Sequence, residues 1–201
     1  MRYVGLVRNV MLGREGLHRE VLLRLVDAAG GRSATSHLTT GNRTFEVAPS
    51  QLDAVVHRLE DNIAGVIGRR EPVVVREAAW FRDLVAGDPS AAYPGDRWEI
   101  AVAFLRLDAL PLDPAAVPRI DGLEAVEVRP HELLLAARRD VRRPGGTYLI
   151  PRPWRDEATT RAWSTVQRLA AVSSGGRQCH RTTSIGSMPS SAGSSKPHTC
   201  A

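Results

Sequence analysis

The chain has 201 residues, of which 43% are apolar, a composition typical of a globular protein. The formal net charge is +5, which by itself suggests a polyanionic partner such as nucleic acid. The residues from 173 onward, however, contribute Arg177, Arg181 and Lys196 and no acidic side chain. We therefore interpret the protein as a nearly neutral body with a basic tail, since a nucleic-acid-binding domain usually concentrates positive charge on one face.

The same composition predicts the compartment of the protein. No apolar run approaches the roughly 20 residues needed to cross a bilayer, and the first residues lead directly into a strand-like run without an apolar signal segment. We therefore expect a cytoplasmic protein with no membrane partner. Both cysteines, Cys179 and Cys200, lie in the tail, so we expect neither a disulfide nor thiol chemistry in the body.

The beginning of the chain predicts a strand, a loop and a helix. An apolar run at residues 2–8 predicts the strand, and a glycine-containing loop follows at 9–16. Apolar residues recur at helical spacing from Leu17 to Ala28, and Gly30 ends the predicted helix, as glycine does just past a helix C-terminus.

The next elements complete the first pattern. Residues 36–47 predict two short strands that fold back on a tight turn at Gly41 and Asn42, because these residue types tolerate positive φ angles. Ser50 is predicted to cap a helix with one continuous apolar stripe. With a strand predicted at 72–76, the order of the elements is β-α-β-β-α-β.

A weaker version of this pattern follows. A helix predicted at 76–86 closes the first part, and residues 89–96 are rich in Pro, Gly and Ala, which is typical of a linker. The elements expected after the linker are a strand at 98–107, a short helix or loop at 113–120, strands at 123–128, 132–137 and 147–150, and a helix at 160–172.

We therefore expect an α+β protein made of two small sandwiches, each an antiparallel sheet with helices on one face. The first occupies residues 1–88, and the second, degenerate one occupies 97–172 after the linker at 89–96. Residues 173–201 are dominated by Ser, Gly and Thr, and we expect a disordered tail because they cannot bury enough apolar surface. Their composition departs so sharply from the body that a shifted reading frame is a hypothesis for their origin.

An ordered set of motifs resembles one bacterial family. The motifs are Tyr3-Val4-Gly5-Leu6-Val7-Arg8 with the Gly13 loop, Thr40-Gly41-Asn42 before a strand with Phe45, Pro72-Val73-Val74-Val75-Arg76, and Thr159-Thr160-Arg161-Ala162-Trp163-Ser164-Thr165-Val166. Together they resemble the domain-of-unknown-function family 1697 (DUF1697), from residue 1 to about residue 172. The resemblance implies two ferredoxin-like (βαββαβ) halves in tandem, and it implies no known activity.

The chain departs from the pattern of this family at three positions. Members usually have Gly after the first Arg and Asn on both sides of the late Trp, whereas this sequence has Asn9, Ala162 and Ser164 there. The stretch between Ile150 and Thr159 is also short, as though part of a helix were missing. The candidate site residues are therefore taken from the chain's own pattern.

The loop after the first strand is the main candidate for a binding site. It precedes a helix, and the N–H groups and partial positive charge of a helix N-terminus favour phosphate or carboxylate. Arg8 and Arg14 can add charge-assisted hydrogen bonds, and Asn9 and Gly13 complete the candidate ligand-binding residues of this loop. The spacing is not that of a known nucleotide-binding loop, so the simpler interpretation is a plain connection.

Three residues outside this loop are also candidates for ligand binding. Thr40 and Asn42 offer a hydroxyl and an amide, although a hairpin turn that needs positive φ angles explains Asn42 without a ligand. Arg161 lies near the predicted start of the last helix, and Trp163 beside it is interpreted as a core residue. The basic loop at 138–143 has no interleaved aromatic residues and is interpreted as solvated rather than as a nucleic-acid site.

No motif identifies a reaction. The histidines show no metal-ligand spacing, and no nucleophile or carboxylate pair stands in a catalytic motif, so we expect no metal and no cofactor. Two functions stay open. One is non-catalytic binding of a small, phosphate-bearing anion or of nucleic acid through the loop near Arg8, and the other is an enzyme of unknown reaction with its site in a cleft between the halves. The pattern leaves the oligomeric state open.

Overall fold

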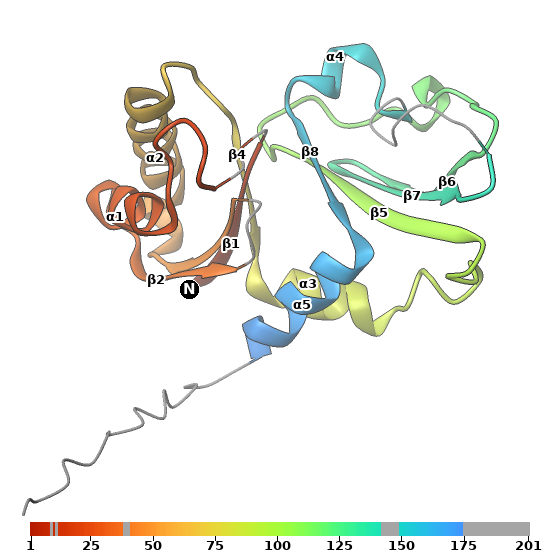
Figure 1. Cartoon of the computed structure of the whole chain (residues 1–201), viewed down its shortest axis with the longest axis horizontal. Helices are drawn as coiled ribbons and strands as arrows, with labels where there is room; N and C mark the ends of the chain where they lie inside the picture. The colour runs from red at the N-terminus through yellow and green to blue at the C-terminus, as the bar shows by residue number, and fades with distance from the viewer. Residues whose placement is uncertain (9, 11, 38–40, 142–148, 175–201) are drawn as a thin grey trace, which may run out of the picture.

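The computed structural model describes residues 1–8, 10, 12–37, 41–141 and 149–174 (Figure 1). In chain order the elements are β1 (Arg2–Val7), α1 (Arg19–Ala29), β2 (Arg32–His37), β3 (Asn42–Glu46), the 3₁₀ helix η1 (Pro49–Gln51), α2 (Leu52–Ile67), β4 (Val73–Glu77), α3 (Ala78–Ala86), β5 (Trp98–Leu105), the 3₁₀ helix η2 (Pro114–Ala116), β6 (Leu123–Arg129), β7 (Glu132–Arg138), α4 (Arg152–Arg155), β8 (Ala158–Ala162) and α5 (Trp163–Ser174).

The first half of the chain forms a four-stranded antiparallel sheet in the order β2-β3-β1-β4. Successive side chains of a strand point to opposite faces, so Tyr3 and Val7 pack beneath α1 and α2. Val4 and Leu6 point the other way and pack against α3 and the second sheet. The central strand β1 is therefore apolar on both faces, which explains its unbroken run of small and apolar residues.

The second half forms another four-stranded antiparallel sheet, in the order β6-β7-β5-β8. Val102 and Phe104 of β5 point toward the first sheet, whereas Ala103 and Leu105 point outward. In the chain order, only the short helices η2 and α4 separate the strands on that side, so short elements and loops cover the outer face. Leu112, Leu149 and Ile150 are among its buried residues. This replacement of long helices is why the second pattern is weaker in sequence.

A shared core joins the two sheets. Helices α3 and α5, which follow the last strand of each sheet, lie side by side between them (Figure 1). Their residues Phe81 and Val166 are fully buried in one cluster with Val4 of the first sheet and Val102 of the second. Trp163, at the start of α5, is 8% exposed in the same cluster, which confirms that it is a core residue.

The two sheets repeat one pairing register. Val4 of β1 is paired with Arg76 of β4, and Val102 of β5 is paired with Arg161 of β8. Arg76 and Arg161 therefore occupy equivalent positions in the two halves. The neighbouring pairs, Leu6–Asn42 and Phe104–Glu132, correspond in the same way.

The last strand lies later in the chain than the sequence predicts. Leu149 and Ile150 of the predicted strand at 147–150 are core residues outside any strand, and residues 147 and 148 lie outside the described residues. The strand is β8, which includes part of the predicted helix at 160–172. The β-branched pair Thr159 and Thr160 suits a strand better than a helix, and the helix begins only at Trp163.

Two local predictions in the first half are also wrong. Asn42 is not a turn residue, because it is the first residue of β3 and is paired with His37, so the chain reverses between them. Ser50 does not cap α2, because it lies inside η1, and Gln51 precedes the helix without a side-chain cap. The 3₁₀ turn that begins at Pro49 takes the place of a capping side chain at this helix start.

The predicted linker and tail can be located relative to the elements. The predicted linker, 89–96, lies between α3 and β5. Of the predicted tail, residues 175–201 lie outside the described residues.

Among the helices that the structure describes, none is long and apolar enough to span a membrane.

Candidate functional site

A cleft of about 820 Å³ opens between the two halves, at the ends of β1 and β8. Its volume falls in the range of roughly 300–1,000 Å³ that is usual for small-molecule sites. The first half contributes the end of β1 and the loop before α1, and the second half contributes β8 and the first turn of α5. We call it the arginine cleft, after its lining residues Arg8, Arg14, Arg69, Arg155 and Arg161.

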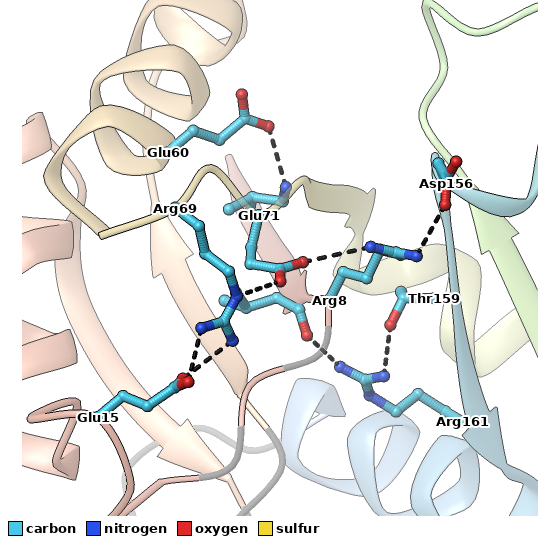
Figure 2. A network of polar contacts seen from close by, with 10 residues as sticks. Arg8, Glu15, Glu60, Arg69, Glu71, Asp156, Thr159 and Arg161 are labelled. Atoms are coloured by element: carbon cyan, nitrogen blue, oxygen red, sulfur yellow. Dashed lines mark hydrogen bonds and ion pairs between the residues drawn. The ribbon is translucent and has the colours of Figure 1, made fainter. Parts of the chain in front are cut away.

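Arg161 forms the wall of the cleft where the two sheets meet. Its side chain leaves β8 and crosses to the first sheet, where Nε donates to Asn42 Oδ1 at 2.6 Å and Nη2 donates to the Val7 carbonyl at 2.9 Å. Nη1 donates to Thr159 Oγ1 at 2.7 Å (Figure 2). Arg161 is 8% exposed, and this burial lowers the pKa of its guanidinium to about 10.

A chain of alternating charges crosses the mouth of the cleft (Figure 2). Arg69 donates to both carboxylate oxygens of Glu15, at 2.6 and 2.9 Å, and its Nε donates to Glu71 Oε1 at 2.8 Å. Arg8 donates to Glu71 Oε2 at 3.4 Å and to Asp156 Oδ1 at 3.2 Å. Because Asp156 belongs to the second half, this chain of contacts links the two halves through Arg8.

The contacts of Arg8 are the weakest in that chain. They are its longest ones, and the Asp156 side chain is 91% exposed. An exposed ion pair of this kind contributes roughly 0–1 kcal/mol, so an incoming anion can displace Asp156 at little cost. Hydrogen bonds to Arg69 lower the pKa of the Glu15 carboxyl, which keeps that partner of Arg69 ionised and leaves Arg8 as the more exchangeable cation.

The loop before α1 places Arg14 and Glu15 at the cleft. Gly13, Glu15 and Gly16 have φ angles of 91°, 53° and 76°, and the turn is closed by hydrogen bonds of 3.0 Å from Gly13 N to Leu17 O and 2.9 Å from Leu17 N to Arg14 O. Arg14 is exposed and makes no side-chain hydrogen bond or ion pair within the described part of the chain. It is therefore available to a ligand.

The helix start itself lies away from this cleft. Helix α1 begins at Arg19, and none of its residues is among the described residues that line the cleft. The backbone N–H groups of Gly13 and Leu17 are used inside the loop. The positive charge of the cleft therefore comes from arginine side chains rather than from the helix N-terminus that the sequence suggested.

The structure brings together three of the residues singled out in the sequence, Arg8, Arg14 and Arg161. Gly13 shapes the loop without lining the cleft, and Asn42 is fully buried behind Arg161 as its acceptor. The remaining two candidates, Asn9 and Thr40, lie outside the described residues.

Sequence reasoning missed Arg69 and Arg155, which also line the cleft, as does Thr165 of the late motif. Arg69 follows the glycine that ends α2, and Arg155 lies in the short helix α4. Neither position stands in a motif, so no local signal marks them. The ion pairs of Arg69, the hydrogen bond from Arg155 to the Ile150 carbonyl and the approach of the two halves bring them to the site.

The other half contains the counterpart of Arg161. Arg76 crosses from β4 to the second sheet, where its Nε donates to Glu132 Oε1 at 2.6 Å and its Nη2 donates to the carbonyls of Leu105 and His131, at 2.7 and 3.0 Å. Each sheet therefore sends one buried arginine into the other. We call Arg76 and Arg161 the exchanged arginines.

The guanidinium groups of the lining can bind an anionic group. Guanidinium groups bind carboxylate and phosphate through two parallel hydrogen bonds, and the described lining residues include no His or Cys. The buried hydroxyl of Thr160, which lines the cleft, makes no hydrogen bond within the described structure. No group of three or more His, Cys, Asp or Glu side chains that could hold a metal ion occurs among the described residues.

Comparisons with known proteins agree with this architecture. Among solved structures, the conserved bacterial protein SP0830 from Streptococcus pneumoniae is similar, with a TM-score of 0.65 and 17% sequence identity over 85% of this chain and 97% of that chain. At this identity the likeness concerns the fold alone. No curated protein matches the chain.

The family model described as "Protein of unknown function (DUF1697)" matches residues 1–133. The match covers the whole first sheet and ends inside β7, so the late motif around Trp163 lies beyond the matched residues. The resemblance seen in the sequence is thereby confirmed, and the chain belongs to the DUF1697 family.

Proposed function

We propose that the protein binds a small, phosphate-bearing anion in the arginine cleft. One observation carries this proposal: Arg8, Arg14 and Arg161, which are far apart in the sequence, line a single cleft of about 820 Å³ together with two further arginines. Arg8 and Arg14 are the ligand contacts in this proposal. Arg161 holds the wall in place and adds its buried charge, because its guanidinium donates to Asn42, Thr159 and Val7 of the protein itself.

A small ligand suits this site better than nucleic acid. The arginines line a cleft, and Glu15, Glu71 and Asp156 flank them, whereas nucleic acid is bound by a continuous basic surface. At the basic loop after β7, Arg138 is paired with Asp140 at 2.6 Å, and Arg139 donates to backbone carbonyls. Catalysis in the same cleft is the alternative function, and it is distinguished by whether a bound compound is converted.

The proposal also includes the organisation of the chain. The strand order of each sheet, with the first and third strands in the middle, is that of a ferredoxin-like unit. We assign residues 1–88 and 97–172 to two such units, with 89–96 as the linker, in a protein of the cytoplasm. The shared register of the two sheets supports this division.

Binding of defined anions to the full chain tests the proposed site. Inorganic phosphate, pyrophosphate, nucleoside triphosphates and a short single-stranded RNA are compared by thermal shift and calorimetry. We expect a phosphorylated small molecule to bind, and Arg8→Ala or Arg14→Ala to weaken it about 10-fold each, because a hydrogen bond to a charged group contributes roughly 1.5–3 kcal/mol. Arg24→Ala, on the exposed side of α1, is the matched control and leaves the affinity unchanged.

A second variant is expected to change the affinity for the anion in the opposite direction. Asp156→Asn removes the carboxylate that competes for Arg8, so we expect a few-fold tighter binding of the same anion. The proposal is wrong if nothing in the panel binds, or if Arg24→Ala weakens binding as much as Arg8→Ala. Tighter binding of RNA than of every small anion favours a nucleic-acid site, and chemical conversion of the bound compound favours an enzyme.

A further inference from the structure

The internal repeat gives the arginine cleft a counterpart on the other side of the molecule. Arg76, the equivalent of Arg161, lines a separate cleft of about 550 Å³ at the ends of β4 and β7. The cleft has an apolar wall of Tyr3, Leu52, Val75, Trp80, Leu107 and Pro130. Its acidic lining residues are Glu77, Asp83 and Glu132, and we call it the acidic cleft.

Equivalent positions carry opposite chemistry in the two clefts. Ala162 and Glu77 each end the last strand of a sheet, immediately before α5 and α3. The third residue of those helices is Thr165 in the arginine cleft and Trp80 in the acidic cleft. The two halves therefore share a backbone arrangement but differ in the side chains at these equivalent positions. The arginine cleft has a small residue and a hydroxyl there, Ala162 and Thr165, whereas the acidic cleft has a carboxylate and an indole ring, Glu77 and Trp80.

The negative charge of the acidic cleft comes from Glu77 and Asp83. Both side chains are exposed, and neither makes an ion pair within the described residues. The charge of Arg76 does not offset them, because Arg76 is 4% exposed and its Nε lies 2.6 Å from Glu132 Oε1. Two uncompensated carboxylates therefore face an apolar wall, an arrangement that is complementary to an organic cation.

Trp80 supplies a rigid aromatic surface for the apolar part of such a cation. Its ring lies edge-on to Phe81 and Phe104, with centroid separations of 5.2 and 5.4 Å, and these contacts fix its orientation. The guanidinium of Arg129 lies 6.0 Å from the Trp80 ring centroid, so the ring already accepts one cation. Across the cleft, the Leu107 side chain is 59% exposed, a large apolar surface with no cover in the described structure.

His131 adds an unsatisfied polar atom to the same wall. Its Nδ1 is buried and has no hydrogen-bond partner in the described structure, while its carbonyl accepts from Arg76 at 3.0 Å. Buried polar atoms in native proteins normally have a partner. This nitrogen is therefore an unsatisfied buried group next to the cleft, and the proposed contacts to a ligand do not include it.

From this cavity, its exposed carboxylates and its aromatic wall, we propose that the acidic cleft is a second binding site, specific for a small organic cation with an aromatic or other apolar group. The ammonium lies toward Glu77 and Asp83, and the apolar group packs between Trp80 and Leu107. This site is independent of anion binding in the arginine cleft, which lies at the equivalent place in the other half.

Three probes with one skeleton and different charge test this site on the full chain. Phenethylamine is cationic, 2-phenylethanol is neutral and 3-phenylpropionate is anionic. We expect phenethylamine to bind with a Kd on the order of millimolar, as is usual for so small a ligand, at least about five-fold tighter than 2-phenylethanol. The anion is expected to bind most weakly of the three.

Binding is measured by titration in ¹⁵N-edited NMR spectra, and Trp80→Phe identifies the indole N–H resonance of Trp80. The double variant Glu77→Gln with Asp83→Asn should remove the preference for the cation and leave the melting temperature unchanged, because both residues are exposed. Asp61→Asn, an exposed acid on α2, is the matched control and keeps the preference.

Three outcomes overturn the proposal. The first is equal binding of all three probes, and the second is a cation preference that survives the double variant. The third is phenethylamine binding that leaves the Trp80 resonance unmoved, since it places the probe elsewhere. None of these outcomes depends on whether the arginine cleft binds phosphate.

Discussion

At the scale of single residues, the exchanged arginines, Arg76 and Arg161, occupy equivalent buried positions but donate to acceptors of different charge. Arg76 donates to the buried Glu132 carboxylate, whereas Arg161 donates to neutral oxygens of Asn42, Val7, Thr159 and Thr160. Burial lowers the pKa of both guanidinium groups. The nearby Glu132 carboxylate opposes this lowering of the pKa for Arg76, whereas for Arg161 burial acts without such an opposing charge.

This difference predicts unequal losses of stability. Arg76→Met leaves the Glu132 carboxylate, which is 6% exposed, without its cation, and breaking a buried ion pair in this way costs about 3–5 kcal/mol. Arg161→Met removes donors from neutral oxygens, which costs about 1–3 kcal/mol. Urea denaturation of the full chain measures both free energies of unfolding.

A double variant supplies the control for that comparison. Adding Glu132→Gln to Arg76→Met replaces the uncompensated charge with a neutral amide, so we expect it to recover part of the lost stability. Equal losses in the two single variants, or no recovery in the double variant, would contradict the argument from charge. The sequence singled out Arg161 as a binding candidate but could not assign it this role, because both of its partners in the first sheet lie more than a hundred positions away.

At the scale of elements, the β2–β3 hairpin depends on Gly41. Its φ angle is 71°, and its carbonyl accepts from Val7 N at 3.2 Å. A Cβ at this position would lie 3.2 Å from Val7 Cβ and 3.3 Å from the Val7 carbonyl oxygen. The hairpin therefore ends against β1 beside the wall of the arginine cleft, since the same carbonyl of Val7 accepts from Arg161.

Two glycine-to-alanine substitutions test this dependence, because they are expected to change the stability of the protein in opposite directions. Gly41→Ala should destabilise the protein by about 1–2 kcal/mol, because the left-handed conformation and the close approach to Val7 both oppose a side chain. Gly65→Ala, in the exposed interior of α2 with nothing within 4 Å of the added Cβ, should stabilise it by about 0.5–1 kcal/mol. Thermal unfolding measures both, and a Gly41→Ala variant as stable as the parent would show that the loop relaxes freely.

The order of most elements could be predicted from periodicity, and the errors have physical reasons. The boundary between β8 and α5 was misplaced because the helical pattern was extended back to Thr160, although Thr159 and Thr160 favour a strand, and both Thr160 and Arg161 are paired with β5. The turn was placed at Asn42 because its residue type suits a turn, whereas its side chain is needed as the acceptor of Arg161. At Asn42 a contact with a distant segment overrides local preference, whereas at β8 the pairing with β5 agrees with it.

At the scale of the whole molecule, the two halves depend on each other. The inner faces of both sheets and helices α3 and α5 share one core, and the exchanged arginines reach across it. Like the Arg8–Asp156 pair, a further contact joins the halves outside the core, where Arg106 Nη1 donates to Glu60 Oε1 at 2.6 Å. The Glu60 side chain is fully buried, so this contact also resists separation.

This dependence predicts that neither half folds alone. A fragment of residues 1–88 would expose Val4, Leu6, Val74 and Phe81, each of which is fully buried in the full chain. We expect the full chain to unfold in one transition, with far-ultraviolet circular dichroism and tryptophan fluorescence coinciding, and the fragment to show no cooperative transition. Two separated transitions in the full chain, or a cooperatively folded fragment, would show that the halves are independent domains.

The amino-acid sequence by itself determined the α+β class, the repeated order of elements, the family, and Arg8 and Arg14 as charges in a loop, because periodicity, turn residues and motifs are local properties. Only the tertiary structure decided that these arginines meet Arg69, Arg155 and Arg161 in one cleft, and that a separate cleft of opposite charge forms with other lining residues. The reason is that both clefts form where two sheets pack together, and a charge there acquires its partners from segments that no local pattern connects.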